Sequence, residues 1–290
     1  MTITTRRSFI ALVAGSGLLA IAGCTDSNAF GESAPTASAA AAPTVTGVSV
    51  AIGSLTGGTA VSLTGSGLAD VVVVTVGGAA ATSLTVDEAG AVSFLTPAAV
   101  DHQPATAAIA LAFADGTSLD AGTPFSYQAV TAVDRQLQYA FTYWQDYNLA
   151  EWSRFSDNDC GNFVNQTLLA RGWQQNSDWY SDYATTGDYS LSWIRGNEMD
   201  DYLNSRDDTT RLDLSQRASV KVGDVVMFDW DPENDNGVDH TMLVSRVDVN
   251  PDGTNAIKLV GHTLDAQYRD FDGAITVENP GGTAHFYSIA

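Results

Sequence analysis

The sequence predicts two folded regions in series, a β-sandwich over residues 44–128 and an α+β region over residues 130–290. The sandwich is indicated by short β-branched runs that glycine-containing turns separate. The second region is indicated by helical patterns followed by strand patterns, which is the order typical of α+β folds. All six tryptophans lie beyond Val130, so the composition changes sharply there. A chain of 290 residues is long enough for both regions.

Residues 1–24 are predicted to be an export signal rather than part of the fold. Arg6 and Arg7 resemble a twin-arginine signal, and the apolar run that follows is short for a membrane span. The run ends in Ile21-Ala22-Gly23-Cys24, which resembles the lipobox of bacterial lipoproteins. We therefore expect lipid on Cys24 and an extracytoplasmic protein held at the cell membrane only through that lipid. An uncleaved membrane anchor is the alternative. Residues 25–43 predict a flexible linker.

The formal net charge of -21 argues against nucleic acids and anionic lipid surfaces as partners, because both would repel the chain. We expect a monomer, and the sequence indicates no cofactor.

Six strands are expected in the first region: Val45–Ile52, Ala60–Thr64, Val71–Val76, Ala91–Leu95, Ala107–Phe113 and Phe125–Tyr127. The turns between them include Gly57-Gly58 and Gly77-Gly78. His102 lies alone in a predicted loop, where we expect a solvated surface histidine.

Residues 57–68, 76–82, 96–97 and 125–127 resemble the IPT/TIG family of immunoglobulin-like domains. The resemblance implies an immunoglobulin-like sandwich that serves as a spacer or a binding module. The segment contains no group of acids, histidines and hydroxyls suited to a reaction.

In the second region, helices are expected over residues 132–148, 160–172 and 191–204. Strands are expected over residues 222–230, 240–247, 256–262, 274–278 and 284–289. The aromatic residues of the segment 172–189 allow two interpretations, a groove for an extended substrate or the core and rim of an irregular insertion. We favour the second.

Because Cys24 is expected to carry lipid, Cys160 is the only cysteine available to the fold, and the pattern places it in the first turn of a helix that Asn158 or Asp159 caps. Unpaired N–H groups and the helix dipole stabilise a thiolate at such a position. We therefore consider Cys160 a candidate nucleophile. The alternative is a small residue of the core.

A nucleophilic cysteine needs a base, and that base needs an orienting group. His240 begins a predicted buried strand and is our candidate base, a solvated histidine at a strand edge being the alternative. His262 ends the next strand and is expected to bond the far nitrogen of His240. Three residues compete with His262 for this place: Asp239, Asp265 and Asn279. We expect His285 to be structural.

Residues 159–166, 222–230, 239–244 and 261–263 together resemble the putative amidase domain family, which is related in plan to the NlpC/P60 and CHAP groups of papain-like cysteine hydrolases. The resemblance implies a papain-like α+β fold, a Cys160–His240 dyad with a polar third residue, and an oxyanion hole. The N–H of Cys160 would contribute to that hole, with Asn158 as a second donor and Asp159 as support. Gly161 departs from the family pattern, in which threonine or serine follows the cysteine.

The acidic loop 229–239 partly resembles a calcium loop, but its glycine is displaced and the closing glutamate is missing. We favour a solvated acidic turn and predict no metal site.

Our leading hypothesis is an exported cysteine amidase or peptidase that acts on cell-envelope peptides, with peptidoglycan as the expected substrate. The alternative is a catalytically inactive surface-binding lipoprotein. Acyl transfer of the transglutaminase kind uses the same thiol and histidine and stays open.

Overall fold

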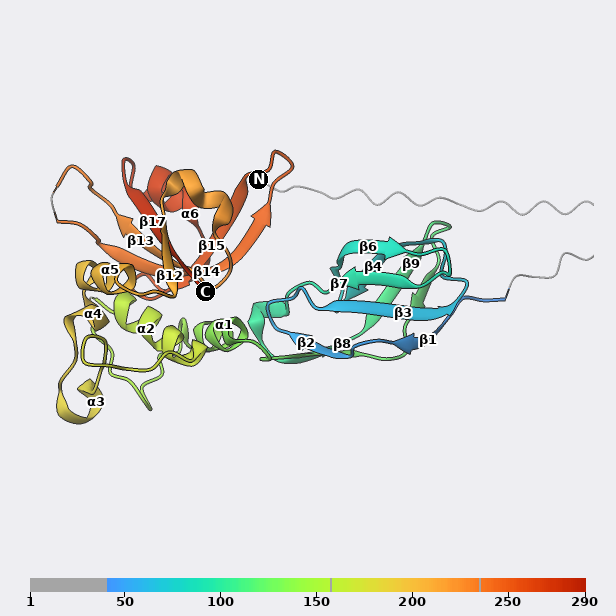
Figure 1. The fold of residues 1–290 in the computed structure, drawn as a ribbon, viewed down its shortest axis with the longest axis horizontal. Helices are drawn as coiled ribbons and strands as arrows, with labels where there is room; N and C mark the ends of the chain where they lie inside the picture. The colour runs from blue at the N-terminus through green and yellow to red at the C-terminus, as the bar shows by residue number, and fades with distance from the viewer. Residues whose placement is uncertain (1–40, 157, 235) are drawn as a thin grey trace, which may run out of the picture. The chain divides into compact units, whose positions relative to one another are not determined.

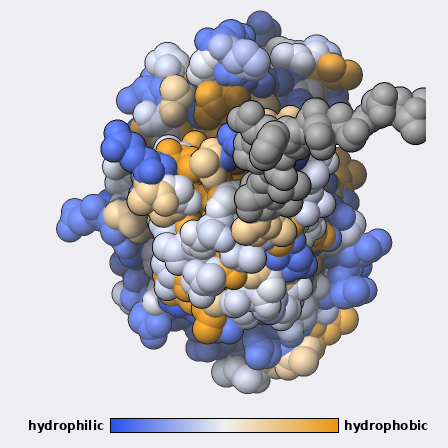
Figure 2. Space-filling view, turned by 90° about the vertical axis from the view of Figure 1, so that its right-hand side faces the viewer, coloured by the Kyte–Doolittle hydropathy of each residue, from blue (hydrophilic) through white to orange (hydrophobic). Residues whose placement is uncertain are grey.

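The computed structural model describes residues 41–156, 158–234 and 236–290 (Figure 1). The predicted signal, Cys24 and residues 25–40 of the predicted linker lie outside these residues. No helix within them is long and apolar enough to pass through a membrane. The face drawn in Figure 2 is a mixture, in which small hydrophobic areas are interrupted by hydrophilic ones.

The first region is built from short strands, as the alternating sequence predicts, and the structure arranges them in three sheets. The sheet orders are β1-β3-β7-β6, β10-β9-β4-β5 and β2-β11-β8. Their bounds are β1 (Thr44–Val48), β2 (Ile52–Ser54), β3 (Ala60–Ser66), β4 (Val71–Val76), β5 (Ala79–Ala80), β6 (Thr82–Val86), β7 (Val92–Leu95), β8 (Ala105–Ala107), β9 (Ile109–Phe113), β10 (Ser118–Asp120) and β11 (Phe125–Gln128). Inward residues such as Val61, Phe94 and Leu111 are buried and form one hydrophobic core.

Two of the expected strands are divided in the structure, and several short strands were not predicted. The run 45–52 becomes β1 and β2, and the run 107–113 is divided between β8 and β9. The predicted turn at Gly57 and Gly58 is confirmed, with φ of 81° and 73°, a backbone conformation that favours glycine.

The prediction of a solvated His102 is wrong, because only 4% of this residue is exposed. It lies in a 3₁₀ turn, η1 (Val100–His102), and its Nε2 is 3.0 Å from the carbonyl oxygen of Ser245. Its ring also packs against Phe141, with ring centroids 4.9 Å apart. A loop histidine becomes buried here because the turn that carries it packs on residues that are distant in sequence.

The second region begins with helices and continues as a six-stranded antiparallel sheet of order β12-β17-β13-β14-β15-β16. The helices are α1 (Ala132–Tyr143), α2 (Cys160–Arg171), α3 (Tyr183–Thr186), α4 (Leu191–Ile194), α5 (Gly196–Asn204) and α6 (Phe271–Gly273), with a 3₁₀ helix η2 (Leu214–Ser219) and a π-helical turn η3 (Ala274–Glu278). The strands are β12 (Thr209–Leu212), β13 (Val225–Asp229), β14 (His240–Val249), β15 (Asn255–Gly261), β16 (Ala266–Asp270) and β17 (Thr283–Ile289).

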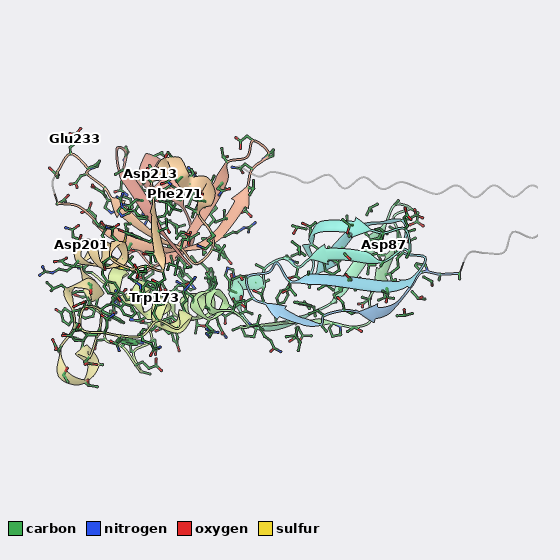
Figure 3. The ribbon with its side chains drawn as sticks, in the orientation of Figure 1. Asp87, Trp173, Asp201, Asp213, Glu233 and Phe271 are labelled. Atoms are coloured by element: carbon green, nitrogen blue, oxygen red, sulfur yellow. The ribbon has the colours of Figure 1, made fainter. Side chains whose placement is uncertain are left out.

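Both faces of this sheet are covered, and each face has its own hydrophobic cluster. Helices α1 and α2 lie on one side of the sheet and α6 on the other (Figure 1). Met227 and Leu243 belong to the cluster that packs on α2, whereas Phe228 and Met242 belong to the cluster around Phe271 of α6. Figure 3 labels Phe271 on its side of the sheet and Trp173 among the helices.

The strand expected over residues 274–278 is wrong, because these residues form the turn η3. Helix α1 ends five residues before the predicted end at residue 148, and the helix expected over residues 191–204 is broken at Arg195, which has an extended backbone. Strands β12 and β16 were not predicted. The order of helices before an antiparallel sheet agrees with the predicted α+β fold.

Candidate active site

Helix α2 begins at Cys160, as the apolar spacing predicts. Asp159 occupies the N-cap position, but its side chain makes no cap bond to the helix. Its Oδ1 accepts hydrogen bonds from the Phe155 backbone N–H at 2.8 Å and from Asn162 Nδ2 at 2.9 Å. The carboxylate therefore joins the preceding loop to the first turn of α2, rather than capping the helix as expected.

The thiol of Cys160 is enclosed, since only 5% of the residue is exposed. Burial raises the pKa of this thiol, while hydrogen bonds from the backbone N–H groups of Thr241 and Gly161 lower it and only partly offset the burial. Sγ also lies 3.8 Å from Oδ1 of Asn158. The helix start does supply donors, but in the resting site the burial outweighs them and the thiol keeps its proton.

His240 begins β14 and is also buried, with 6% of the residue exposed. It lies opposite Phe228 in the sheet, so its side chain belongs to the face that packs on α6. Ring centroids are 6.2 Å from Phe228 and 5.9 Å from Trp230. Burial and then the positive charge of Arg269 lower the pKa of His240 to about 4, so the ring is neutral at neutral pH. Its buried Nε2 has no hydrogen-bond partner among the described residues.

Cys160 and His240 lie next to the same point of the chain, the start of β14. The sulfur of Cys160 accepts a hydrogen bond from the backbone N–H of Thr241, the residue that follows His240. Thr241 faces the α2 side of the sheet with Met227, whereas His240 faces the other side. Within residues 41–156, 158–234 and 236–290, no hydrogen bond joins the thiol to the imidazole.

His262 does not bond His240 as expected, because both of its ring nitrogens have other partners. Nδ1 lies 2.5 Å from Oδ2 of Asp159, and Nε2 lies 2.8 Å from the carbonyl oxygen of Tyr143. The ring is stacked between Tyr147 and Phe163, at 3.8 and 4.0 Å between centroids. His262 therefore anchors Asp159, the residue that precedes the candidate nucleophile Cys160.

The three residues that compete with His262 as the group orienting His240 also have other partners. Asp265 accepts a hydrogen bond from the Tyr147 hydroxyl at 2.7 Å, and Asn279 donates to the carbonyl oxygen of Ala274 at 3.1 Å. Asp239 accepts from the Trp230 backbone N–H at 2.8 Å. The amide nitrogen of Asn158, our second oxyanion donor, is 3.3 Å from the carbonyl oxygen of Ile194.

His285 pairs with Asp200 through Nε2 and Oδ1 at 2.5 Å, and Tyr287 donates to the same oxygen at 2.7 Å. This network links β17 to α5, which agrees with the structural role we expected.

The aromatic insertion supplies both core and surface. Trp179 and Trp193 are fully buried, in agreement with the interpretation we favoured. Tyr180, Tyr189 and Tyr202 instead line an open hollow of about 620 Å³.

Sequence reasoning missed Arg269, which lies on β16 close to His240. No strand was predicted there, so the sequence placed this charge in a loop. The strand pattern that precedes it ends at His262, and two residues with positive φ, Thr263 and Leu264, then turn the chain back.

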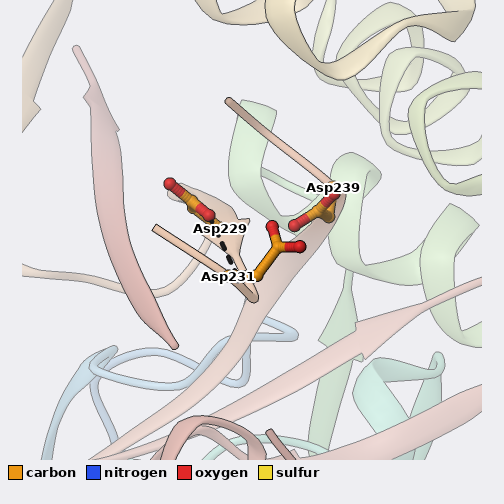
Figure 4. A group of neighbouring side chains, drawn as sticks. All are labelled: Asp229, Asp231 and Asp239. Atoms are coloured by element: carbon orange, nitrogen blue, oxygen red, sulfur yellow. Dashed lines mark hydrogen bonds between the residues drawn. The ribbon is translucent and has the colours of Figure 1, made fainter. Parts of the chain in front are cut away.

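The acidic loop brings three carboxylates together, those of Asp229, Asp231 and Asp239 (Figure 4). One oxygen of each lies within 4.8 Å of the others. The Asp231 backbone N–H donates to Asp229 Oδ1 at 3.2 Å. Exposed acidic groups commonly gather without an ion, and we assign no metal to them.

Comparison with known families divides the chain where its composition changes. The profile of the Putative amidase domain matches residues 126–287. The chain belongs to the Putative amidase domain family. The profile of the IPT/TIG domain matches residues 43–127, which confirms the resemblance of the first region. Membership in an amidase family supports a hydrolase.

Solved structures show only a limited likeness. One is the SGBP-B of the Bacteroides ovatus mixed-linkage glucan utilization locus in complex with a mixed-linkage heptasaccharide, at 25% identity, and another is the SGBP-B of a xyloglucan utilization locus in Bacteroides uniformis, at 27%. Each match covers 28% of this chain and 20% or 23% of the other, with a TM-score of 0.23. This chain thus spans about a fifth of those proteins, and a TM-score this low carries no argument. The curated proteins contain no significant match.

Proposed function

We propose that this member of the Putative amidase domain family is a cysteine-dependent amide hydrolase of papain-like plan. Cys160 is the nucleophile and His240 is the base. The observation that carries the proposal is the convergence of backbone N–H groups from the starts of α2 and β14 on the one free thiol of the described residues. Such donors stabilise negative charge on sulfur during attack.

The protonation states fit general-base catalysis. At neutral pH the thiol is protonated and the imidazole is neutral, so His240 can accept the thiol proton as the sulfur attacks the amide carbonyl. His240 then gives that proton to the leaving amine. Water, deprotonated by the same imidazole, attacks the thioester, and the thiol is regenerated. For these transfers the His240 ring has to rotate from the Phe228 side of the sheet toward the sulfur of Cys160. In this mechanism, substrate binding triggers the rotation.

The expected substrates are peptides of the cell envelope, with peptidoglycan stem peptides foremost. Residues 1–24 support export and a lipid anchor at Cys24, and the IPT/TIG domain serves as the spacer or binding module. The extracytoplasmic location and the scissile bond rest on these sequence features and on the family.

Incubation with purified peptidoglycan, followed by mass spectrometry of the released peptides, tests the proposal. We expect new amine and carboxyl ends with the native chain and loss of more than 99% of the activity in Cys160→Ala and His240→Ala. The Asp87→Asn variant, on the sandwich, is the matched control and should keep full activity. Hydrolysis that survives in Cys160→Ala would refute the mechanism.

A second candidate is the inactive surface-binding lipoprotein. It is favoured by the lack of a described hydrogen bond between Cys160 and His240 and by the enclosed thiol. Binding to peptidoglycan without any released peptide in the same assay would establish it.

A further inference from the structure

The His240 ring is surrounded by side chains that no part of the chemistry above has used. We call the group of Phe228, Trp230, Met242, Arg269 and His240 the His240 cluster. Phe228 and Trp230 stack on each other at 4.4 Å between centroids, and both lie within about 6 Å of the imidazole. Met242 follows His240 by two residues on the same face of β14. The cluster is apolar except for Arg269 and His240 themselves.

Arg269 is fixed in this cluster by three separate contacts. It stands opposite Leu259 in the β15–β16 pair, and its side chain is only 9% exposed. Its Nη1 lies 3.7 Å from Sδ of Met242, and its Cζ lies 5.7 Å from the centroid of the Trp230 ring. Its Nη2 forms an ion pair with Glu278. Most arginines keep their charged group in water. The largely buried guanidinium of Arg269 is therefore unusual, and these contacts hold it in a defined position.

The position of Arg269 matters because His240 is the only other side chain of the cluster that can carry a charge. When His240 is protonated, that charge is also positive. A second positive charge beside the guanidinium is unfavourable, and more so away from water. Nε2 of His240 is buried, and no described residue accepts a hydrogen from it. Within the described part of the chain, the ring therefore lacks the orienting acceptor that the sequence led us to expect, and the charged side chain that shares its cluster is a cation.

We propose that Arg269, held by Glu278, is a positioning residue of the active site that disfavours the charged form of His240 and so helps the imidazole pass the proton of Cys160 on to the leaving amine. The inference rests on the proposed function, in which His240 takes that proton and passes it to the leaving amine. Arg269 neither takes nor gives a proton. It acts only through the imidazole, by disfavouring the charged form and so favouring the return of the proton to product.

Other ionisable groups also lie around the start of β14. Asp229 ends β13, Asp239 precedes His240, and Asp231 lies in the loop between these strands. Cys160 approaches from α2. A carboxylate beside the ring would favour an imidazolium, so the test varies the charge at Arg269 alone.

The test is the titration of His240 in the full chain by NMR of ring-labelled histidine. The chain contains four histidines, and loss of one signal in His240→Asn assigns the resonance. In Arg269→Met we expect the pKa of His240 to rise by about one pH unit, the usual effect of losing a neighbouring like charge. Arg269→Lys keeps the charge and should stay near the native value. Glu278→Gln leaves Arg269 without its counter-charge and should lower the pKa further.

The same variants shift the acid limb of the pH profile for peptide hydrolysis in the same directions. A rise from about 4 to about 5 in Arg269→Met halves the neutral fraction of His240 at pH 5, so activity there should fall about twofold more than at pH 8. Arg246→Met is the matched control, because Arg246 also pairs with a carboxylate and lies on β14, but is exposed. It should move neither the titration nor the profile.

The two proposals fail separately. An unchanged His240 titration in Arg269→Met, with the protein folded, overturns the role of Arg269 whatever the activity. Equal shifts in Arg269→Met and Arg269→Lys also overturn it, because they would point to packing rather than charge. Full hydrolysis by Cys160→Ala overturns the proposed function and leaves the titration result standing.

Discussion

Replacing His262 by alanine is expected to destabilise the second region by about 3 to 5 kcal/mol, because Asp159 then keeps a buried carboxylate without its partner. Nδ1 of His262 and Oδ2 of Asp159 are 2.5 Å apart, and both side chains are only 2% exposed. The two remaining bonds of Asp159, from Phe155 and Asn162, serve its other oxygen.

The assay is urea unfolding followed by tryptophan fluorescence. All six tryptophans lie beyond Val130, so the signal reports the second region and not the sandwich. A double-mutant cycle with Asp159→Ala, His262→Ala and the double variant separates the pair from the lost packing on Tyr147 and Phe163. We expect a coupling energy of at least about 2 kcal/mol.

His285→Ala is the control, because His285 and Asp200 are also 2.5 Å apart but are 14% and 27% exposed. Solvent reaches this pair, and its loss should cost only about 1 kcal/mol. The reasoning is refuted if the coupling between Asp159 and His262 is below about 0.5 kcal/mol, or if both histidine variants lose the same stability.

Three further predictions use the same unfolding assay. Burial, together with the charge of Arg269, lowers the pKa of His240 from 6.5 to about 4, so the neutral ring contributes stability that is complete above pH 6.5. This stability is lost as the pH falls from 6.5 through 4. Over this range His240→Phe should lose about 3 kcal/mol less than the native chain. Gly161→Thr should lower the free energy of unfolding by about 1 to 3 kcal/mol. The reason is that a Cβ at this position lies 3.2 Å from the Trp193 carbonyl oxygen and 3.3 Å from the carbonyl carbon of Ile194. A variant as stable as the native chain would contradict this packing. Asp134→Ala removes the acceptor of Ser54 Oγ at 2.6 Å and of the Thr131 N–H at 2.9 Å. We expect faster amide exchange at Thr131 and a loss of about 2 kcal/mol in the free energy of unfolding. Unchanged exchange would show that this cap of α1 is dispensable.

The elements that the sequence predicted well are those whose pattern is local. The sandwich strands alternate between core and surface, so a period of two residues identified most of them. Helix α2 starts and ends where its spacing, Cys160 and Gly172 indicate. Residues 274–278 misled the prediction because their β-branched side chains favour a strand, whereas Asp270 bonds the N–H of Gly273 at 2.7 Å and starts a helical turn just before them.

The faces of β14 and β15 could not be read from the sequence. Residues 240–245 are buried on both sides of the sheet, so their apolar run has no alternation that would show which residues face α2. Alternate residues of a strand face opposite sides of the sheet, so the register decides which side chains reach the site. His240 shares its face with Met242, while His262 shares the α2 face with Val260. The sequence named both histidines as site residues, but only the register separates the one beside Arg269 from the one that holds Asp159.

The two opposite pKa shifts at the site bear on how an attack by Cys160 would begin. Burial raises the pKa of the thiol and lowers that of His240, so a resting thiolate–imidazolium pair is unfavourable on both counts. On the proposed mechanism the proton moves as the sulfur attacks, and the N–H groups of Thr241 and Gly161 act on the charge that develops at that moment. The hydrolysis rate should therefore stay level from about pH 5.5 to pH 8, because neither group changes its charge in that range. A bell centred near neutral pH would instead show a preformed ion pair, and would mean that substrate binding reverses the effect of burial on both residues.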